Sequence, residues 1–171
     1  MCPAREARDR DAQGDVSLFE ATPETRMLRR SMRRMDPARA VKRFRRAADG
    51  RPEGPEDVRP LEWLERTVAH LWAVAREELA VAAAKEAEED GGWIVELHEF
   101  LADRLQAVRK DLVIQGLSGP RAIALFERVV RFHVLFGYLL SQQAAPVYDE
   151  YLGCVGGCVR SRGGLDPTAA G

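Results

Sequence analysis

Cysteine is scarce in this sequence, with three residues in 171. Cys2, Cys154 and Cys158 are too few and too unevenly placed for a disulfide framework, which is typical of proteins in a reducing compartment. Cys154 and Cys158 could form half of a zinc site, but such a site needs four ligands and no histidine follows them. We therefore expect free thiols, no metal and no other cofactor.

Long hydrophobic runs are also absent. No stretch approaches the roughly 20 uncharged apolar residues of a membrane span. The amino terminus lacks the apolar core of a secretory signal. Together these absences predict an intracellular protein without a membrane-spanning segment.

The common catalytic motifs are missing too. The sequence has no glycine loop followed by Lys-Ser or Lys-Thr, no G-x-S-x-G and no H-E-x-x-H. His70, His98 and His133 fall in separate predicted helices without partners at metal-ligand spacing, so we expect histidines of the core. We predict that the protein is not an enzyme and has no small-molecule substrate.

Apolar residues recur at helical spacing in three long stretches. They predict helices over residues 61–90, 93–115 and 120–140. Because the links between them are short, neighbouring helices should pack as antiparallel pairs. The predicted fold class is therefore all-α.

The middle stretch also carries charged residues, which could form a catalytic cluster or the solvent side of a helix. They are Asp103, Arg104, Arg109, Lys110 and Asp111. One apolar stripe with a period near 3.6 contains Leu97, Leu101, Leu105, Val108 and Leu112. Arg104 and Lys110 are expected to lie away from this stripe, and adjacent residues such as Asp103 and Arg104 do not normally face each other. We predict a packed helix with a salt-bridged solvent side.

The amino-terminal third has weaker signals. The apolar residues of VSLF, at 16–19, predict a short helix or turn. Asp36-Pro37 supplies an N-cap and a first helical position, which predicts a basic helix over about 37–48. The proline and glycine linker GRPEGPEDVRP then separates this helix from the long ones.

These signals divide the chain into three parts. We expect an amino-terminal arm with a short helix over residues 1–35 and a helical domain over residues 36–145. A glycine-rich tail over residues 146–171 has too little apolar periodicity for an element, so we expect disorder there.

Positive charge is concentrated in residues 26–51, which we name the basic segment. It holds 11 basic and two acidic residues, a net charge of +9, and leaves −10 for the rest of the chain. Arginine pairs bidentately with phosphate oxygens, so the segment could bind nucleic acid. It could equally lie on the protein's own acidic helices or on an acidic subunit. The candidate residues for phosphate or for an acidic partner are Arg29, Arg30, Arg33, Arg34, Lys42, Arg43, Arg45 and Arg46.

Five segments, in this order, resemble the SAC-three/GANP family of nuclear messenger-RNA export proteins. This family is typified by the yeast leucine permease transcriptional regulator and by germinal-centre-associated nuclear protein. The segments are MCPAREARDRD, RMDPARAVKRFRRAADG, PEDVRPLEWLERTVAHL, FLADRLQAVRKDLVIQ and AIALFERVVRFHVLFGYLL, over about residues 1–140. Lys42 falls on the lysine of the family's A-V-K-x-[YF]-x-R motif, and Arg45 and Arg46 occupy its last two positions.

The resemblance implies a tetratricopeptide-like array of helix pairs, followed in the family by a winged-helix module. It implies a non-enzymatic scaffold subunit of the second transcription-export complex, in the nucleus at the nuclear pore. The implied partners are PCI-type and small acidic subunits, with messenger RNA or an export receptor after them. A short animal member linked to centrosomes and mitosis implies an alternative location at the centrosome or in the cytoplasm.

The sequence also departs from the family pattern at both ends. Only Met1-Cys2-Pro3 matches the family's opening C-P-x-M-C-P motif, and the pattern is lost at YDEYLGCVGGC, before the winged helix. We therefore expect the amino-terminal half of the domain, as a fragment, a truncated gene model or a degenerate copy.

Two alternatives to a scaffold stay open. The first is a nucleic-acid-binding module whose affinity comes from the arginines of the basic segment. The second is a truncated chain with no function of its own. In that case part of the apolar arc over residues 126–140 would be exposed, which favours a dimer or aggregation.

Overall fold

The described part of the chain is built from α-helices. The computed structural model describes residues 1–45, 54–84 and 92–141. Its helices are α1 (Ala4–Ala12), α2 (Leu61–Ala84), α3 (Gly92–Ile114) and α4 (Pro120–Ser141), with short 3-10 turns at Leu18–Glu20, Arg30–Met32 and Pro55–Asp57. These residues contain no strand beyond one isolated bridge between Ala21 and Met35. The prediction of an all-α fold is confirmed.

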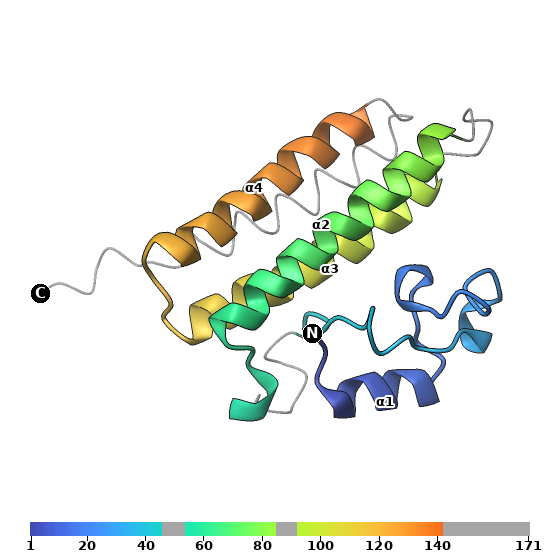
Figure 1. Cartoon of the computed structure of the whole chain (residues 1–171), viewed down its shortest axis with the longest axis horizontal. Helices are drawn as coiled ribbons and strands as arrows, with labels where there is room; N and C mark the ends of the chain where they lie inside the picture. Colours follow the sequence, from blue (N-terminus) through green and yellow to red (C-terminus); the bar gives the residue numbers. More distant parts are fainter. Residues whose placement is uncertain (46–53, 85–91, 142–171) are drawn as a thin grey trace, which may run out of the picture.

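The three long helices form a bundle (Figure 1). α2, α3 and α4 lie along a common direction and alternate in sense, so that α2 with α3 and α3 with α4 make antiparallel pairs. These are the helix pairs expected of a tetratricopeptide-like array. The observed bounds agree closely with the predicted helices over 93–115 and 120–140, and the predicted end of the first long helix, after residue 84, lies outside the described residues.

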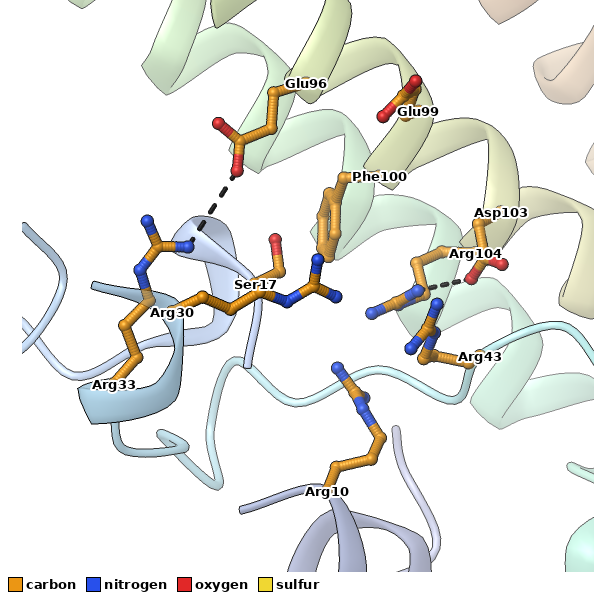
Figure 2. A pocket seen from close by; sticks show the side chains of 10 residues that line it. All are labelled: Arg10, Ser17, Arg30, Arg33, Arg43, Glu96, Glu99, Phe100, Asp103 and Arg104. Atoms are coloured by element: carbon orange, nitrogen blue, oxygen red, sulfur yellow. Dashed lines mark hydrogen bonds and ion pairs between the residues drawn. The ribbon is translucent and has the colours of Figure 1, made fainter. Parts of the chain in front are cut away.

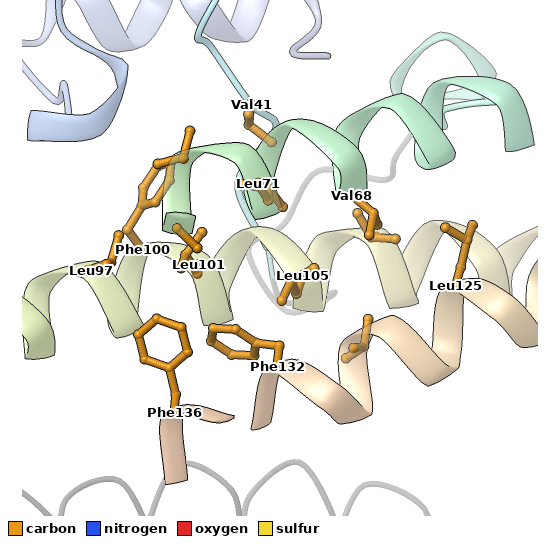
Figure 3. Close-up of a cluster of buried hydrophobic side chains, with 14 of the residues drawn as sticks. Val41, Val68, Leu71, Leu97, Phe100, Leu101, Leu105, Leu125, Phe132 and Phe136 are labelled. Atoms are coloured by element: carbon orange, nitrogen blue, oxygen red, sulfur yellow. The ribbon is translucent and has the colours of Figure 1, made fainter. Parts of the chain in front are cut away.

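One hydrophobic core joins the bundle to the amino-terminal arm (Figure 3). Leu101 and Leu105 of α3 pack with Leu71 of α2 and with Phe132 of α4. Val41 of the amino-terminal arm, which in the structure comprises residues 1–45, reaches the same cluster. All five side chains are at most 2% exposed. Because each such side chain contributes about 1.5–3 kcal/mol on burial, this core is the main source of stability.

A glycine turn sets the antiparallel course of α3 and α4. Gly116 has φ +58°, a left-handed conformation that glycine adopts without strain. The backbone N–H of Gly116 donates to the carbonyl of Val113 at 3.0 Å, and that of Leu117 donates to Leu112 at 3.1 Å. These two hydrogen bonds close the carboxyl end of α3, and Pro120 then starts α4.

α4 leaves an apolar stripe facing solvent within the described part of the chain. Ile123, Val130, Val134 and Tyr138 are between 56% and 69% exposed. They are spaced at seven, four and four residues, so they share one side of the helix opposite its buried face.

The predicted basic helix over 37–48 is wrong for the residues that the structure describes. Residues 37–39 form a single turn, residues 41–45 have no regular secondary structure, and Arg46 with the remainder lies outside the described residues. The backbone N–H groups of Val41, Arg43 and Phe44 donate to carboxylates of Glu20, Glu6 and Asp103, at 2.9, 2.8 and 3.3 Å. These distant acceptors replace the helical ones, so the local helix signal is overridden.

Helix α1 was not anticipated by the sequence analysis. Its sequence, AREARDRDA, has no apolar stripe, and its buried residues are Glu6 and Arg10. A helix that buries charge lacks the periodicity from which helices are predicted. The short helix or turn expected at 16–19 is present as the 3-10 turn Leu18–Glu20. The predicted tail over 146–171 lies outside the described residues, and the proposed domain boundaries remain predictions.

Stability should fall in mild acid because of His98. Its ring is 3% exposed and stacks on Phe132 at 5.6 Å. Burial first, and then the charge of His133, lower the pKa of His98 from 6.5 to about 4. The unfolded chain therefore binds a proton at His98 more tightly than the folded chain does. The stability that neutral His98 contributes is complete above pH 6.5 and is lost as the pH falls toward 4.

We expect the free energy of unfolding to drop by about 2–3 kcal/mol between pH 7.5 and 4.5 from this group. Urea titrations at the two pH values measure it. The variant His98→Phe, which keeps an aromatic ring against Phe132, should lose up to one proton of this dependence. A variant as acid-sensitive as the wild type would contradict the assignment.

Candidate functional site

α3 has two buried faces, and the second carries charge. The first is the predicted leucine stripe. The second contains Phe100, Arg104, Ala107 and Asp111, at spacings of four, three and four, and it faces the amino-terminal arm. The prediction that Arg104 lies on the solvent side is wrong, because it is 3% exposed, and Asp111 on the same face is 0% exposed. Asp103 also pairs directly with Arg104, contrary to the expectation for adjacent residues.

Glu20 is the first of two buried carboxylates that join the arm to α3. It forms ion pairs with Arg10 of α1 and, at 2.8 Å, with Arg104 of α3. Burial would raise the pKa of Glu20, but the charge of Arg104 and the hydrogen bond from Arg10 outweigh it and lower that pKa. Glu20 is thus ionised at neutral pH and holds α1, the arm and α3 together.

Asp111 is the second buried carboxylate, and it lies on α3 about two turns after Arg104. Lys42 donates to its Oδ1 at 2.8 Å, and the Nε of Arg59 donates to its Oδ2 at 2.7 Å. The Lys42 ammonium also donates to the backbone carbonyl of Asp57 at 2.7 Å. Asp111 thus holds Lys42 and its neighbours in the arm on one side, and Arg59, just before the start of α2, on the other.

Four candidate residues of the basic segment form ion pairs within the protein, and the exposure of their side chains ranges from 3% for Lys42 to 62% for Arg30. Lys42 is 3% exposed and bound to Asp111, so the structure gives it an intramolecular role. Arg30 and Arg43 both pair with Asp15, Arg30 at 2.5 Å. Arg33 lies 4.0 Å from Glu96 of α3 and its side chain is 15% exposed.

Three other candidate residues point outward. The side chains of Arg34 and Arg45 are 70% and 47% exposed, with Asp11 at 3.5 Å from Arg34 and Glu6 at 4.0 Å from Arg45. Arg29 is exposed and forms no ion pair with a described residue. Arg46, the last candidate, lies outside the described residues. The predicted binding roles of all these residues remain proposals.

A cavity of about 280 Å³ lies between the arm and α3 (Figure 2), and we name it the arginine pocket. Five arginines line it, together with acidic residues of α3. The arginines are Arg10, Arg30, Arg33, Arg43 and Arg104. Three of them are candidate residues of the basic segment, whereas the sequence analysis missed Arg10 and placed Arg104 in solvent. The signal available for Arg10 was its spacing of four residues from Glu6.

The chemistry for metal binding or thiol reactivity is weak here. Within the described ranges, no group of three His, Cys, Asp or Glu side chains could hold a metal ion. Burial and then the charge of Glu6 raise the pKa of the Cys2 thiol to about 12, which keeps it protonated and unreactive. Cys154 and Cys158 lie outside those ranges. No helix in the described part of the chain is long and apolar enough to cross a membrane.

The fold and the site define an all-α protein in which an arginine-rich arm is anchored to a helix bundle by buried ion pairs. The chain belongs to the SAC3/GANP family, whose model matches residues 1–153. The family resemblance seen in the sequence is thereby confirmed.

Three curated relatives align with most of this chain. It is 31% identical over 136 residues to SAC3 family protein 1 of Schizosaccharomyces pombe. It is 27% identical over 135 residues to SAC3 family protein B of Arabidopsis thaliana, and 26% identical over 152 residues to Protein xmas of Drosophila melanogaster. These alignments cover 79%, 79% and 88% of this chain but only 11%, 7% and 7% of the relatives. No solved structure matches the chain.

Removal of the buried charge at Glu20 should strongly destabilise the protein. In Glu20→Gln, Arg10 and Arg104 keep their buried charges without a full counter-charge, which costs about 3–5 kcal/mol. Urea unfolding at pH 7 measures the loss. Glu65→Gln is the matched control, because it removes a carboxylate from the exposed pair with Arg121 and should change little. Equal losses in the two variants would contradict the anchoring role.

Proposed function

We propose that this chain is a non-enzymatic scaffold module with a role in messenger-RNA export. Membership of the SAC3/GANP family supports an export-related role and a nuclear location. The proposed assembly resembles the second transcription-export complex at the nuclear pore. Its partners are PCI-type and small acidic subunits first, and messenger RNA or an export receptor second.

The observation that carries the scaffold proposal is how the basic segment uses its charge. Six of its seven described candidate residues lie within 4.0 Å of a carboxylate of this same chain. A surface that bound phosphates with these residues would first have to break their internal pairs, or share them. The segment thus acts foremost as a structural element that holds the arm in one shape for partner proteins.

A nucleic-acid-binding module is the second candidate function. It is favoured by the outward-facing arginines Arg29, Arg34 and Arg45. The side chain of Arg34, for example, is 70% exposed although it lies near Asp11. It gains no support from aromatic stacking, because the ring of Phe44 lies against the Lys110 ammonium at 5.8 Å. We therefore rank RNA after protein partners.

RNA-binding titrations separate the two functions. Binding of the full chain to single-stranded RNA at 50 and 200 mM salt is compared with that of Arg29→Glu/Arg34→Glu/Arg45→Glu. If these arginines contact phosphates, the variant loses about 2 from the slope of log affinity against log salt. The scaffold proposal expects weak binding and a change in slope well below that value. A slope loss of about 2 would contradict it.

A cellular measurement tests the export role itself. After depletion of the protein, polyadenylated RNA should accumulate in the nucleus, and re-expression of the wild type should reverse this. The Glu20→Gln variant, in which the arm is no longer anchored, should fail to rescue, whereas Glu65→Gln should succeed. Unchanged nuclear RNA after depletion would contradict a role in export.

A further inference from the structure

We propose that the arginine pocket binds one acidic side chain of a partner protein, with a basic side chain of the same partner beside it. This inference rests on the proposed scaffold function, because it names where a protein partner would bind. It goes beyond that function by assigning a cavity, its ligand chemistry and the residues that receive the ligand.

Guanidinium groups from four segments meet in this cavity. Arg10 comes from α1 and Arg104 from α3, whereas Arg30 and Arg43 come from two separate stretches of the arm. The ends of the four side chains point into the same space in Figure 2. A fifth, Arg33, lies at the edge, where it pairs with Glu96 at 4.0 Å. Several positive charges held at one place favour an anion between them.

The internal carboxylates are shared among these arginines. Asp15 forms ion pairs with both Arg30 and Arg43. Burial would raise the pKa of Asp15, but the hydrogen bond from Arg30 and the charges of both arginines outweigh it and lower that pKa. Glu20 likewise serves both Arg10 and Arg104. Asp103 pairs with Arg104 as well, and Glu6 lies 4.0 Å from Arg10. Each guanidinium carries five N–H donors, so these carboxylates still leave donors for another acceptor.

Two of the spare donors are buried. The Nε atoms of Arg10 and Arg104 have no hydrogen-bond partner among the described residues, and these side chains are 6% and 4% exposed. A buried N–H without a partner costs about 1–3 kcal/mol. A carboxylate in the pocket would offset this cost through its charge and through charge-assisted hydrogen bonds from the terminal N–H groups of the lining arginines, which are among the stronger ones.

The acidic rim on α3 selects a peptide over RNA. Glu96, Glu99 and Asp103 line the same cavity as the arginines. A chain of phosphates would meet these carboxylates and be repelled, whereas a protein segment can place a lysine or arginine near them. The volume of about 280 Å³ is at the lower end of the range for ligand pockets, so it suits one or two side chains.

A peptide titration tests the proposal. The probe is a ten-residue glycine-serine peptide with one glutamate and one lysine two positions apart, and the matched probe has glutamine in place of the glutamate. Binding to the ¹⁵N-labelled full chain is followed through the arginine Nε–H signals. The glutamate peptide should shift the signals of Arg10 and Arg104 and bind about tenfold more tightly than the glutamine peptide.

Two double variants locate the binding site on the chain. Arg30→Ala/Arg43→Ala removes two pocket arginines and should abolish binding. Arg29→Ala/Arg34→Ala removes the same charge from the arm outside the pocket and should leave binding unchanged. The backbone amide spectrum shows whether each variant is folded, and the Nε–H signals of the unmodified protein test the site without any variant.

Three results would overturn the proposal. They are equal affinity for the two peptides, equal loss of binding in the two double variants, and tighter binding of a uridine decanucleotide than of the glutamate peptide at 150 mM salt. The outcome is separable from that of the proposed function. Peptide binding without nuclear RNA accumulation after depletion would refute the export role alone, and accumulation without peptide binding would refute the pocket alone.

Discussion

The structure depends on two carboxylates that are removed from water. Glu20 and Asp111 are both 0% exposed, and each binds two cations from different segments of the chain. A buried charge costs several kcal/mol unless it is paired, so these segments must stay together for the fold to persist. This requirement turns an arm that is poor in apolar residues into a fixed part of the domain. The core of leucines and phenylalanines supplies stability, whereas the ion pairs supply the position of the arm.

The fixed position of the arm sorts its arginines into two sets. Backbone hydrogen bonds from Val41, Arg43 and Phe44 to the carboxylates of Glu20, Glu6 and Asp103 hold this stretch in place. Lys42 then enters the protein, and Arg43 turns toward the arginine pocket. The net charge of the basic segment is thus a poor guide to its surface, because part of that charge is used inside. This use of charge supports the proposed scaffold function, in which the arm presents a surface of mixed charge to partner proteins.

Apolar periodicity predicted the long helices well. α3 and α4 lie within about one residue of their predicted bounds, because their buried faces are leucine, valine and phenylalanine. The same method failed where the buried residues are charged. α1 buries Glu6 and Arg10, and α3 buries Arg104 on a face that looks polar in the sequence.

The arm could not be predicted from local sequence for a related reason. Its non-helical backbone depends on hydrogen-bond acceptors up to 59 residues away in the sequence, such as the carboxylate of Asp103 for the amide of Phe44. Local capping signals at Asp36-Pro37 produced only a single turn. For the candidate site, three of the candidate arginines, Arg30, Arg33 and Arg43, line the pocket, and their binding roles remain proposals. The remaining members, Arg10 and Arg104, are brought together by Glu20, which is a long-range contact of both.

Hydrogen exchange of the arm's backbone amides tests the central claim most directly. If buried carboxylates anchor the arm, the amides of Val41, Arg43 and Phe44 should exchange slowly, with protection close to that of the α3 amides, in the full chain at pH 7. Protection should then fall in all three together when the bundle unfolds. Exchange of these amides at the rate of a free loop, while α3 stays protected, would contradict the account.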